Sequence, residues 1–551
     1  MDKNNLIGIT LVFLLFFIWA QYNAPSPEEL AERERIQDSI KLAQVQQDST
    51  ASISDDTSGQ NIPQSTESDS VRQARLQTQF GAFANGMTGE EQTSFLENDL
   101  FKVIFTNKGG RIKEVILKKY HKLDLNEERE EVQQALKMLE DEKNRFEFQI
   151  PLDGNQVLSS ADLYFEPQLK DSVLTFRMNA GPGQYIEQQY TIQSGRYNID
   201  YDIQINGMNL SAESLKFTWI NYLDKLERNT TYERNYSAIY YKEGEDSPDH
   251  CSCTGDDVED SNEPLRWISH SNQFFNTTLI AEASFNAAVM ETTTIPAEGE
   301  DLKKLKSVID IPYENGQAIA LKMYVGPNEF DRLSTYNMDL EDIIPYGSSI
   351  FGTINRWIIR PLFGFLSGFI GSKGIVILIL TLIVKLLLYP LSYKMLHSQS
   401  KMGALKPRIE ALKAKLGDDQ QQQQMETMKL YREFGVSPLG GCFPIMLQMP
   451  IWFALYRFFP ASIEFRQAPF LWATDLSSFD VFAYLPFSVP FYGEHISMFT
   501  LLWAVTTVIY TYYNTRHMDM SVNPMMKYMQ YFMPIMFLFF FNNFASGLSC
   551  Y

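Results

Sequence analysis

Cysteine is scarce in this sequence. Its 551 residues include four cysteines. Cys251 and Cys253 form a single C-x-C in a polar, acidic loop, a setting that favours loop thiols or a strained local disulfide over a metal site. Cys442 and Cys550 lie in apolar stretches, where cysteine usually packs as a small apolar side chain. The cysteine pattern therefore excludes a disulfide scaffold.

Motifs for catalysis and for nucleotide use are also missing. The six histidines all lie outside the predicted membrane spans: His121, His250, His270, His397, His495 and His517. A serine nucleophile inside the membrane would therefore have no histidine base within reach. The sequence contains no H-E-x-x-H and no P-loop. We therefore expect no catalytic residue, no metal and no cofactor.

The first 345 residues carry a large excess of negative charge. The chain has a net charge of −20, but residues 346–551 carry 16 Lys and Arg against 10 Asp and Glu, so residues 1–345 have a net charge of −26. An acidic region of this size repels phosphate backbones, and we identify no direct nucleic-acid site. It is typical of a solvated domain outside the cytoplasm.

The N-terminus begins with an apolar run. Residues 6–20 read LIGITLVFLLFFIWA. A cleaved signal peptide is the alternative, but no clean small-x-small site follows the run. We predict an uncleaved transmembrane anchor over residues 1–23 with its N-terminus in the cytoplasm. Residues 24–78, rich in Ser, Asp, Gln and Glu, predict a flexible tether.

Residues 79–345 alternate between apolar and polar side chains. The clearest alternating sets are Phe101, Val103 and Phe105; Leu174, Phe176 and Met178; and Tyr197, Ile199, Tyr201, Ile203 and Ile205. This period predicts antiparallel sheets with one face buried, as in an all-β sandwich. One interruption, NEEREEVQQALKMLEDEKNR (126–145), places Val132, Leu136 and Leu139 at helical spacing. It predicts an inserted surface helix.

From residue 346 the composition indicates a multi-pass α-helical membrane core. Residues 351–369 mix two arginines with aromatic and aliphatic residues, which predicts an amphipathic helix in the membrane interface. Four apolar segments follow, each near the ~20 residues that cross a bilayer: about 374–396, 439–459, 496–514 and 526–547. The chain ends at SGLSCY directly after apolar sequence, and we expect that a final span is missing.

The segment 393–437 sets the orientation of these spans. It carries eight Lys and Arg residues, and basic loops stay in the cytoplasm. This orientation places residues 79–345 outside the cytoplasm.

The same segment has the pattern of a helical hairpin. Apolar residues from Met402 to Leu416 follow the 3-4 spacing of a coiled-coil seam, with Pro407 expected to restart the helix after a break. A second helix, 420–434, is expected to place Met425, Met428 and Tyr431 on one side. A simple connector is the alternative. The length of the segment 393–437 favours a docking surface over a connector, and this surface includes Lys401, Lys406, Arg408, Lys413 and Lys415.

Lys385 interrupts the apolar segment ILILTLIVKLLLYPLSY (377–393). A charge near the bilayer centre costs about 2.5–3.5 kcal/mol on insertion scales. Helical spacing places Lys385 on the same face as Thr381 and Tyr389. Two interpretations remain open. Lys385 can extend to the interface as an anchor, or it can line a polar groove together with polar residues of the other spans: Gln448, Thr506, Thr507, Asn542 and Asn543. A transporter is a third interpretation, but five spans without a visible repeat match that architecture poorly.

Three stretches resemble the YidC family of membrane protein insertases. They are TLIVKLLLYPL (381–391), PLGGCFPIMLQMPIWFALYRFF (438–459) and RQAPFLWATDLS (466–477). The anchor and the acidic β domain resemble the Gram-negative form, which has a supersandwich-like periplasmic domain. The resemblance implies an inner-membrane protein that inserts and folds nascent membrane proteins, alone or with the Sec translocon. A translocon-associated assembly chaperone without its own insertion activity is the alternative.

The resemblance also implies roles for individual residues. Lys385 occupies the position of the positive residue in a hydrophilic groove, where the family more often has arginine. Thr381 and Tyr389 match groove positions, and Met449 and Trp452 match positions along the substrate path, next to the polar Gln448. The basic hairpin matches a region expected to engage nascent chains, the ribosome or signal-recognition targeting factors. The family carries a further span after SGL.

Overall fold

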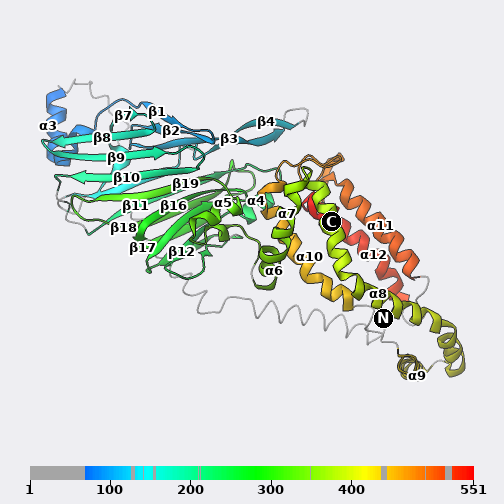
Figure 1. Ribbon diagram of the computed structural model, residues 1–551. Coiled ribbons are helices and arrows are strands. Elements are labelled where there is room, and N and C mark those ends of the chain that lie inside the picture. The colour runs from blue at the N-terminus through cyan, green and yellow to red at the C-terminus, as the bar shows by residue number, and fades with distance from the viewer. Residues whose placement is uncertain are drawn as a thin grey trace, which may run out of the picture. The chain divides into compact units, whose positions relative to one another are not determined.

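The computed structural model of the chain describes residues 69–125, 131–140, 142–152, 157–208, 210, 213–252, 254–347, 349–417, 419–435, 443–489, 492–515 and 524–551 (Figure 1). The predicted anchor and most of the tether lie outside the described residues. The end of the predicted tether is helical, in α3 (Asp69–Phe80).

Antiparallel strands form the first part of the described chain. Their bounds are β1 (Thr93–Glu97), β2 (Phe101–Thr106), β3 (Arg111–Leu125), β4 (Glu131–Met138), β5 (Arg145–Pro151), β6 (Val157–Ser159), β7 (Glu166–Lys170), β8 (Val173–Gly181), β9 (Gln184–Ile192), β10 (Asn198–Asn206), β11 (Ser214–Asp224), β12 (Ala238–Glu243), β13 (Asp249–His250), β14 (Asp257–Ser261), β15 (Leu265–Ser271), β16 (Phe275–Phe285), β17 (Ala287–Thr294), β18 (Asp301–Pro312) and β19 (Ala318–Pro327). Short helices between and after them are η1 (Gly81–Gly86), η2 (Ser160–Asp162), α4 (Thr230–Asn235), α5 (Phe330–Leu333), η3 (Ser334–Tyr336) and η4 (Leu340–Ile343).

Two large sheets enclose the core of this domain. Within the described ranges, one sheet has nine strands in the order β13-β12-β15-β16-β19-β10-β9-β8-β7, and the other has six in the order β14-β17-β18-β11-β5-β6. Their inner faces meet where Trp219 of β11 stacks on His270 of β15, with ring centroids 3.7 Å apart. The alternating residues of β2, β8 and β10 are buried, as predicted. The all-β sandwich is therefore confirmed.

The predicted surface helix at 126–145 is wrong. Its described part contains β4, which pairs with β3 in a four-stranded sheet with β1 and β2. Leu136 and Met138 of β4 are buried in the core, whereas Val132 is exposed. The segment contains good helix formers, but β3 offers a paired edge and an apolar face, and these tertiary contacts outweigh local propensity.

Helices dominate the chain after the β domain (Figure 1). Their bounds are α6 (Ser349–Ile354), the π-helical η5 (Asn355–Ile359), α7 (Arg360–Phe369), α8 (Lys373–Leu416), α9 (Gln420–Glu433), α10 (Phe443–Ala461), η7 (Ile463–Phe465), α11 (Met498–Thr515), α12 (Pro524–Phe541) and α13 (Ser546–Cys550), with a hairpin of β20 (Ala483–Val489) and β21 (Gly493–Ile496) before α11. Within the described residues, one stretch, Lys373–Pro390, is long and apolar enough to cross a membrane, with a mean hydropathy of 2.1.

Two predicted helix boundaries are wrong. The helix does not break before Pro407, because α8 runs without interruption through Pro390 and Pro407. Each proline removes one backbone hydrogen bond, and a long helix tolerates such a loss. The last predicted span, 526–547, ends early at Phe541, where Asn542 leaves the helix and bonds to neighbouring loops.

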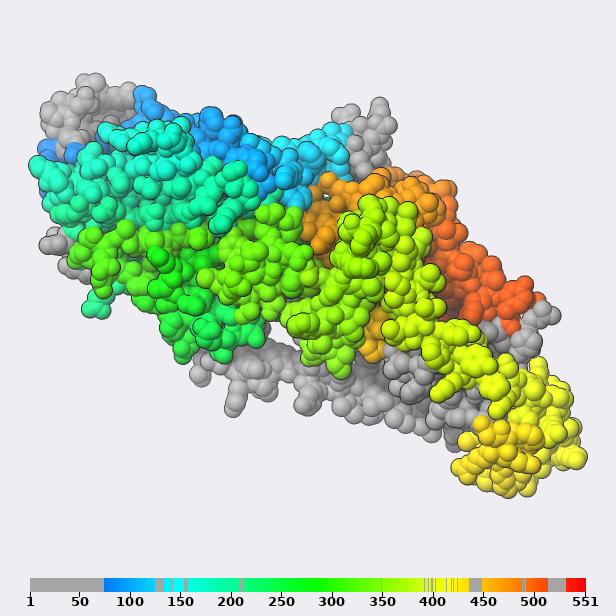
Figure 2. All heavy atoms as spheres, in the orientation of Figure 1, coloured from blue at the N-terminus to red at the C-terminus, as the bar shows by residue number. Residues whose placement is uncertain are grey.

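The hairpin of α8 and α9 has a small apolar seam. Leu405 and Ile409 are buried against Leu430 and Tyr431. Of the residues expected on one side of α9, Tyr431 packs against the seam, whereas Met425 and Met428 are exposed. In the space-filling view the hairpin, in yellow, projects beyond the neighbouring helices (Figure 2).

Candidate substrate groove

Among the described side chains, those of α8, α10 and α11 pack tightly together at one end of the three helices. Within the apolar stretch Lys373–Pro390 of α8, the buried residues Val376, Ile377, Leu380 and Val384 all precede Lys385. Gly374 lets this end approach the loop after α10, because a Cβ there would lie 2.0 Å from Cγ of Phe470. The short helix α13 contacts α8, α10 and α11 at the same end.

The other end of the bundle is loosely packed. On α10, burial begins at Ala454, whereas the described side chains from Gln448 to Phe453 are exposed or half-buried. On α11, Phe499, Thr500 and Ala504 are buried, and the described side chains after Ala504 are not. Buried contacts hold protein helices together, so the described side chains of α8, α10 and α11 beyond this boundary contribute little to the packing between these helices. Side chains there face either lipid or a water-accessible groove.

Lys385 lies directly at the boundary between the two ends. It is exposed, and it forms no hydrogen bond or ion pair with the described part of the chain. At 3.6 residues per turn it lies between the buried stripe of α8 and the exposed stripe that contains Leu382 and Leu386. A cation in this place is free to interact with an incoming anionic group.

The other predicted groove residues lie on α8 and α10. Thr381 is half-buried and donates its hydroxyl to the carbonyl of Ile377 at 2.8 Å, and Tyr389 is exposed one turn beyond Lys385. Gln448 is half-buried and Met449 is exposed. Trp452 stacks on Tyr456 and contacts Phe541 of α12, with ring centroids 5.9 and 6.0 Å apart. Trp452 therefore packs into the bundle, and Met449 has the more open position on α10.

Asn542, directly after α12, does not line a groove. Asn542 is fully buried; its side-chain amide donates to the carbonyls of Tyr492 and His495, each at 2.9 Å, and accepts the backbone N–H of Ser497 at 2.9 Å. Asn542 thus joins the β20–β21 hairpin to the packed end. The interpretation that Asn542 lines a groove is wrong. Thr506 on α11 bonds back to its own helix, at the carbonyl of Leu502.

We expect Asn542→Ala to destabilise the packed end strongly. It leaves several buried polar groups without partners, at about 1–3 kcal/mol for each. Asn543→Ala is the matched control, because that side chain is only part-buried and donates one longer bond, 3.3 Å, to Tyr492. Thermal unfolding of the full chain in detergent measures the difference. Equal midpoints for the two variants would contradict the assignment.

Buried polar contacts join the β domain to the packed end. Arg466, after η7, pairs with Glu227 at 2.6 Å, and the two side chains are only 2% and 8% exposed. Further contacts are Arg466 Nη2 to the His121 carbonyl at 2.7 Å, Gln273 Nε2 to the Pro460 carbonyl at 2.6 Å, and Asn229 Nδ2 to the Asn543 carbonyl at 3.2 Å. The sequence analysis did not identify these residues, since the partners lie hundreds of positions apart.

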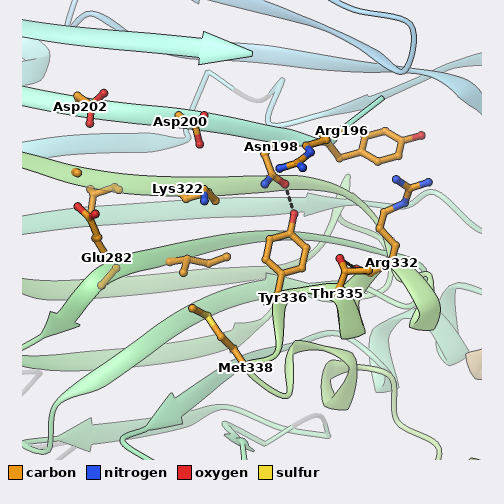
Figure 3. Close-up of a pocket in the computed structure, with 15 residues that line it drawn as sticks. Arg196, Asn198, Asp200, Asp202, Glu282, Lys322, Arg332, Thr335, Tyr336 and Met338 are labelled. Atoms are coloured by element: carbon orange, nitrogen blue, oxygen red, sulfur yellow. Dashed lines mark hydrogen bonds between the residues drawn. The ribbon is translucent and has the colours of Figure 1, made fainter. Parts of the chain in front are cut away.

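A hollow of about 770 Å³ lies on the nine-stranded sheet, away from the groove. Figure 3 shows Asp200 and Asp202 of β10 on one side and Arg332 on the other, with Tyr336 bonded to Asn198. None of the predicted groove residues lines this hollow. Its mixed charges give it no surface of a single sign.

Two protein families together match nearly the whole described part of the chain. The YidC periplasmic domain family matches residues 95–365, and the 60Kd inner membrane protein family matches residues 365–551. Membrane protein insertase YidC of Parabacteroides distasonis is 37% identical over 582 residues, covering 100% of this chain and 90% of the relative. The protein of the same name from Phocaeicola vulgatus is 36% identical over 575 residues, covering 100% and 89%. The chain belongs to the YidC family of membrane protein insertases.

Among solved structures, an active YidC insertase with its first transmembrane domain resolved is 19% identical, with a TM-score of 0.33, covering 88% of this chain and 95% of that one. The two family matches show which part of this YidC-family chain corresponds to which domain. Residues 95–365, with their sheets, are the periplasmic domain, and the helical part belongs to an inner-membrane protein. The predicted family, localisation and insertase function are therefore confirmed.

Proposed function

We propose that this insertase passes its substrates through a groove between α8 and α10. The observation that carries the proposal is the unpaired Lys385 at the boundary between the packed and the open end of the bundle. Thr381 and Tyr389 extend the polar stripe. Gln448 and Met449 provide the facing wall, and Trp452, stacked on Tyr456, supports this wall from inside the bundle. A groove shortens the hydrocarbon that a polar tail must cross, and a cation in a setting of low dielectric attracts acidic residues in that tail.

The proposed topology is multi-pass. α8, α10, α11 and α12 cross the membrane, the N-terminus lies in the cytoplasm, and the packed end lies at the periplasmic surface. The basic α8–α9 hairpin then lies in the cytoplasm, which agrees with the positive-inside rule. Its basic surface includes the exposed residues Lys401, Arg408 and Lys415 and the half-buried Lys406. Lys413, whose side chain lies outside the described ones, belongs to the same proposed docking surface by its place in the sequence.

The proposed partners follow from this arrangement. Nascent membrane proteins are the substrates, and the bilayer accepts them. The hairpin, with exposed Met425 and Met428 beside its basic residues, suits a nascent chain, the ribosome or signal-recognition targeting factors. The Sec translocon is a partner for larger substrates. The proposal includes no catalytic step and no cofactor. Insertion into liposomes that lack Sec separates autonomous insertion from a purely translocon-associated chaperone, which would show none.

Water accessibility tests the groove directly. In a cysteine-free background, Lys385→Cys is expected to react with a membrane-impermeant maleimide from the cytoplasmic side. Leu386→Cys is the matched control, because Leu386 is 71% exposed yet lies on the apolar face next to Lys385. Rapid labelling of position 385 and slow labelling of position 386 support the groove. Equally slow labelling of both would mean that lipid surrounds Lys385.

A further inference from the structure

A pocket of about 1010 Å³, the Arg457 pocket, lies between the β domain, the α6–η5 helix and α10. Its polar side includes Ser247, Ser252 and Thr254 from the β domain. Its other side is formed by aromatic residues of the helical region, among them Trp357, Tyr456 and Phe544. The pocket therefore joins a polar wall to an apolar one.

Two arginines line this pocket. Arg356 pairs with Asp342 at 3.0 Å, which largely cancels its charge, although its buried Nε has no hydrogen-bond partner. Arg457 is exposed and has no ion-pair partner among the described residues. The stem of Arg457 lies beside Gly347, where a Cβ would make an ordinary contact with Cγ of Arg457 at 3.6 Å. The pocket therefore retains about one positive charge.

The surroundings of the pocket indicate an amphipathic occupant. Trp357 is 78% exposed at its edge, and Ile350 and Ile358 expose apolar side chains on the same helix. Exposed tryptophan beside aliphatic residues is typical of the membrane–water interface. Arg457 lies one turn before α10 ends at Ala461, a position from which a guanidinium reaches phosphate groups at the membrane surface.

We propose that the Arg457 pocket binds the headgroup of an anionic phospholipid in the periplasmic leaflet. Arg457 binds the phosphate, because a guanidinium matches phosphate oxygens with two parallel hydrogen bonds. The single net negative charge of such a headgroup complements the pocket. The acyl chains then follow the exposed apolar face of α6 and η5. The inference rests on the proposed topology of α10 and is independent of the groove.

Native mass spectrometry of the full chain in detergent tests the proposal, with phosphatidylglycerol as the probe and phosphatidylcholine for comparison. We expect the first phosphatidylglycerol to bind more tightly than phosphatidylcholine. Arg457→Gln should weaken it about fivefold, the typical contribution of one basic residue near anionic lipid. Arg457→Lys should lose less affinity for phosphatidylglycerol than Arg457→Gln does, since lysine retains the positive charge. Arg177→Gln, in β8 and outside the pocket, is the matched control and should bind like the unmodified chain.

Three results would overturn the proposal. Arg457→Gln could bind phosphatidylglycerol as tightly as the control does. Excess inorganic phosphate could displace the lipid, which would indicate a site for free anions. An acidic peptide could displace it, which would indicate a polypeptide site. Lipid binding is measured without insertion, so failure of the Lys385 groove leaves this result unchanged.

Discussion

Lys385→Glu is expected to abolish insertion of substrates whose translocated tails carry acidic residues. Two unit charges about 4 Å apart interact by on the order of 4 kcal/mol near a protein surface. The substitution turns this attraction into a repulsion of similar size. Because 1.36 kcal/mol changes a rate tenfold, insertion should slow by more than about a hundredfold. Lys385→Arg retains the charge and should retain most of the activity.

Complementation of an insertase-depleted strain measures this effect, with a small Sec-independent substrate in versions with acidic and with neutral tails. Lys394→Ala is the matched control, because Lys394 is an exposed lysine of α8 on the opposite face of the helix. The loss should be large for the acidic tail and small for the neutral one. Normal insertion of the acidic version by Lys385→Glu would rule out the charge interaction, leaving Lys385 at most a role in hydrating the groove.

The sequence predicted the parts of the site that depend on one helix. Spacing along α8 placed Lys385 with Thr381 and Tyr389, and the structure retains that stripe. Residues that depend on tertiary packing were harder to place. Asn542 was expected beside a groove because it is a polar residue in an apolar segment. The local sequence does not show that its side chain bonds to the β20–β21 hairpin instead. Trp452 matches a substrate-path position by resemblance, yet it stacks on Tyr456 inside the bundle.

The same distinction between local pattern and tertiary packing applies to the prediction of the fold. Strict alternation predicted the buried faces of β2, β8 and β10, since one sheet face meets one core. Leu136 was misassigned to a helix because the helical spacing of Val132, Leu136 and Leu139 gives no information about pairing with β3, although β3 directly precedes β4 in the sequence. The buried partners Arg466 and Glu227, in different domains, left no local pattern.

Arg466→Leu is expected to give the largest loss of stability in this chain. Arg466 pairs with buried Glu227, and its guanidinium lies 5.1 Å from the ring centroid of Phe275. Glu233, also buried, accepts the backbone N–H groups of Leu226 and Glu227. Removing the arginine leaves buried carboxyl groups without their cation, which typically costs about 3–5 kcal/mol. Arg177→Leu is the control, because its pair with Glu187 is partly exposed and worth about 1 kcal/mol or less.

The pH dependence identifies the carboxyl group responsible. Burial raises the pKa of Glu227 to about 7 against the opposing effect of Arg466, whereas the unfolded value is 4.5. Between these values Glu227 binds more protons in the folded chain than in the unfolded chain, so its contribution to stability falls as the pH rises from about 4.5 to about 7 and then levels off. Without Arg466 the pKa of Glu227 rises further, and the fall continues above pH 7.

Thermal unfolding of the full chain in detergent at pH 6 and pH 8 measures this interaction. Arg466→Leu should lose more stability at pH 8 than at pH 6, and Glu227→Gln combined with Arg466→Leu should recover part of the loss, because no charge then remains unpaired at position 227. Equal midpoints for Arg466→Leu and Arg177→Leu at pH 8 would show that this ion pair does not hold the periplasmic domain to the packed end. The contact between the β domain and the packed end would then depend on the remaining hydrogen bonds, from Gln273 to Pro460 and from Asn229 to Asn543.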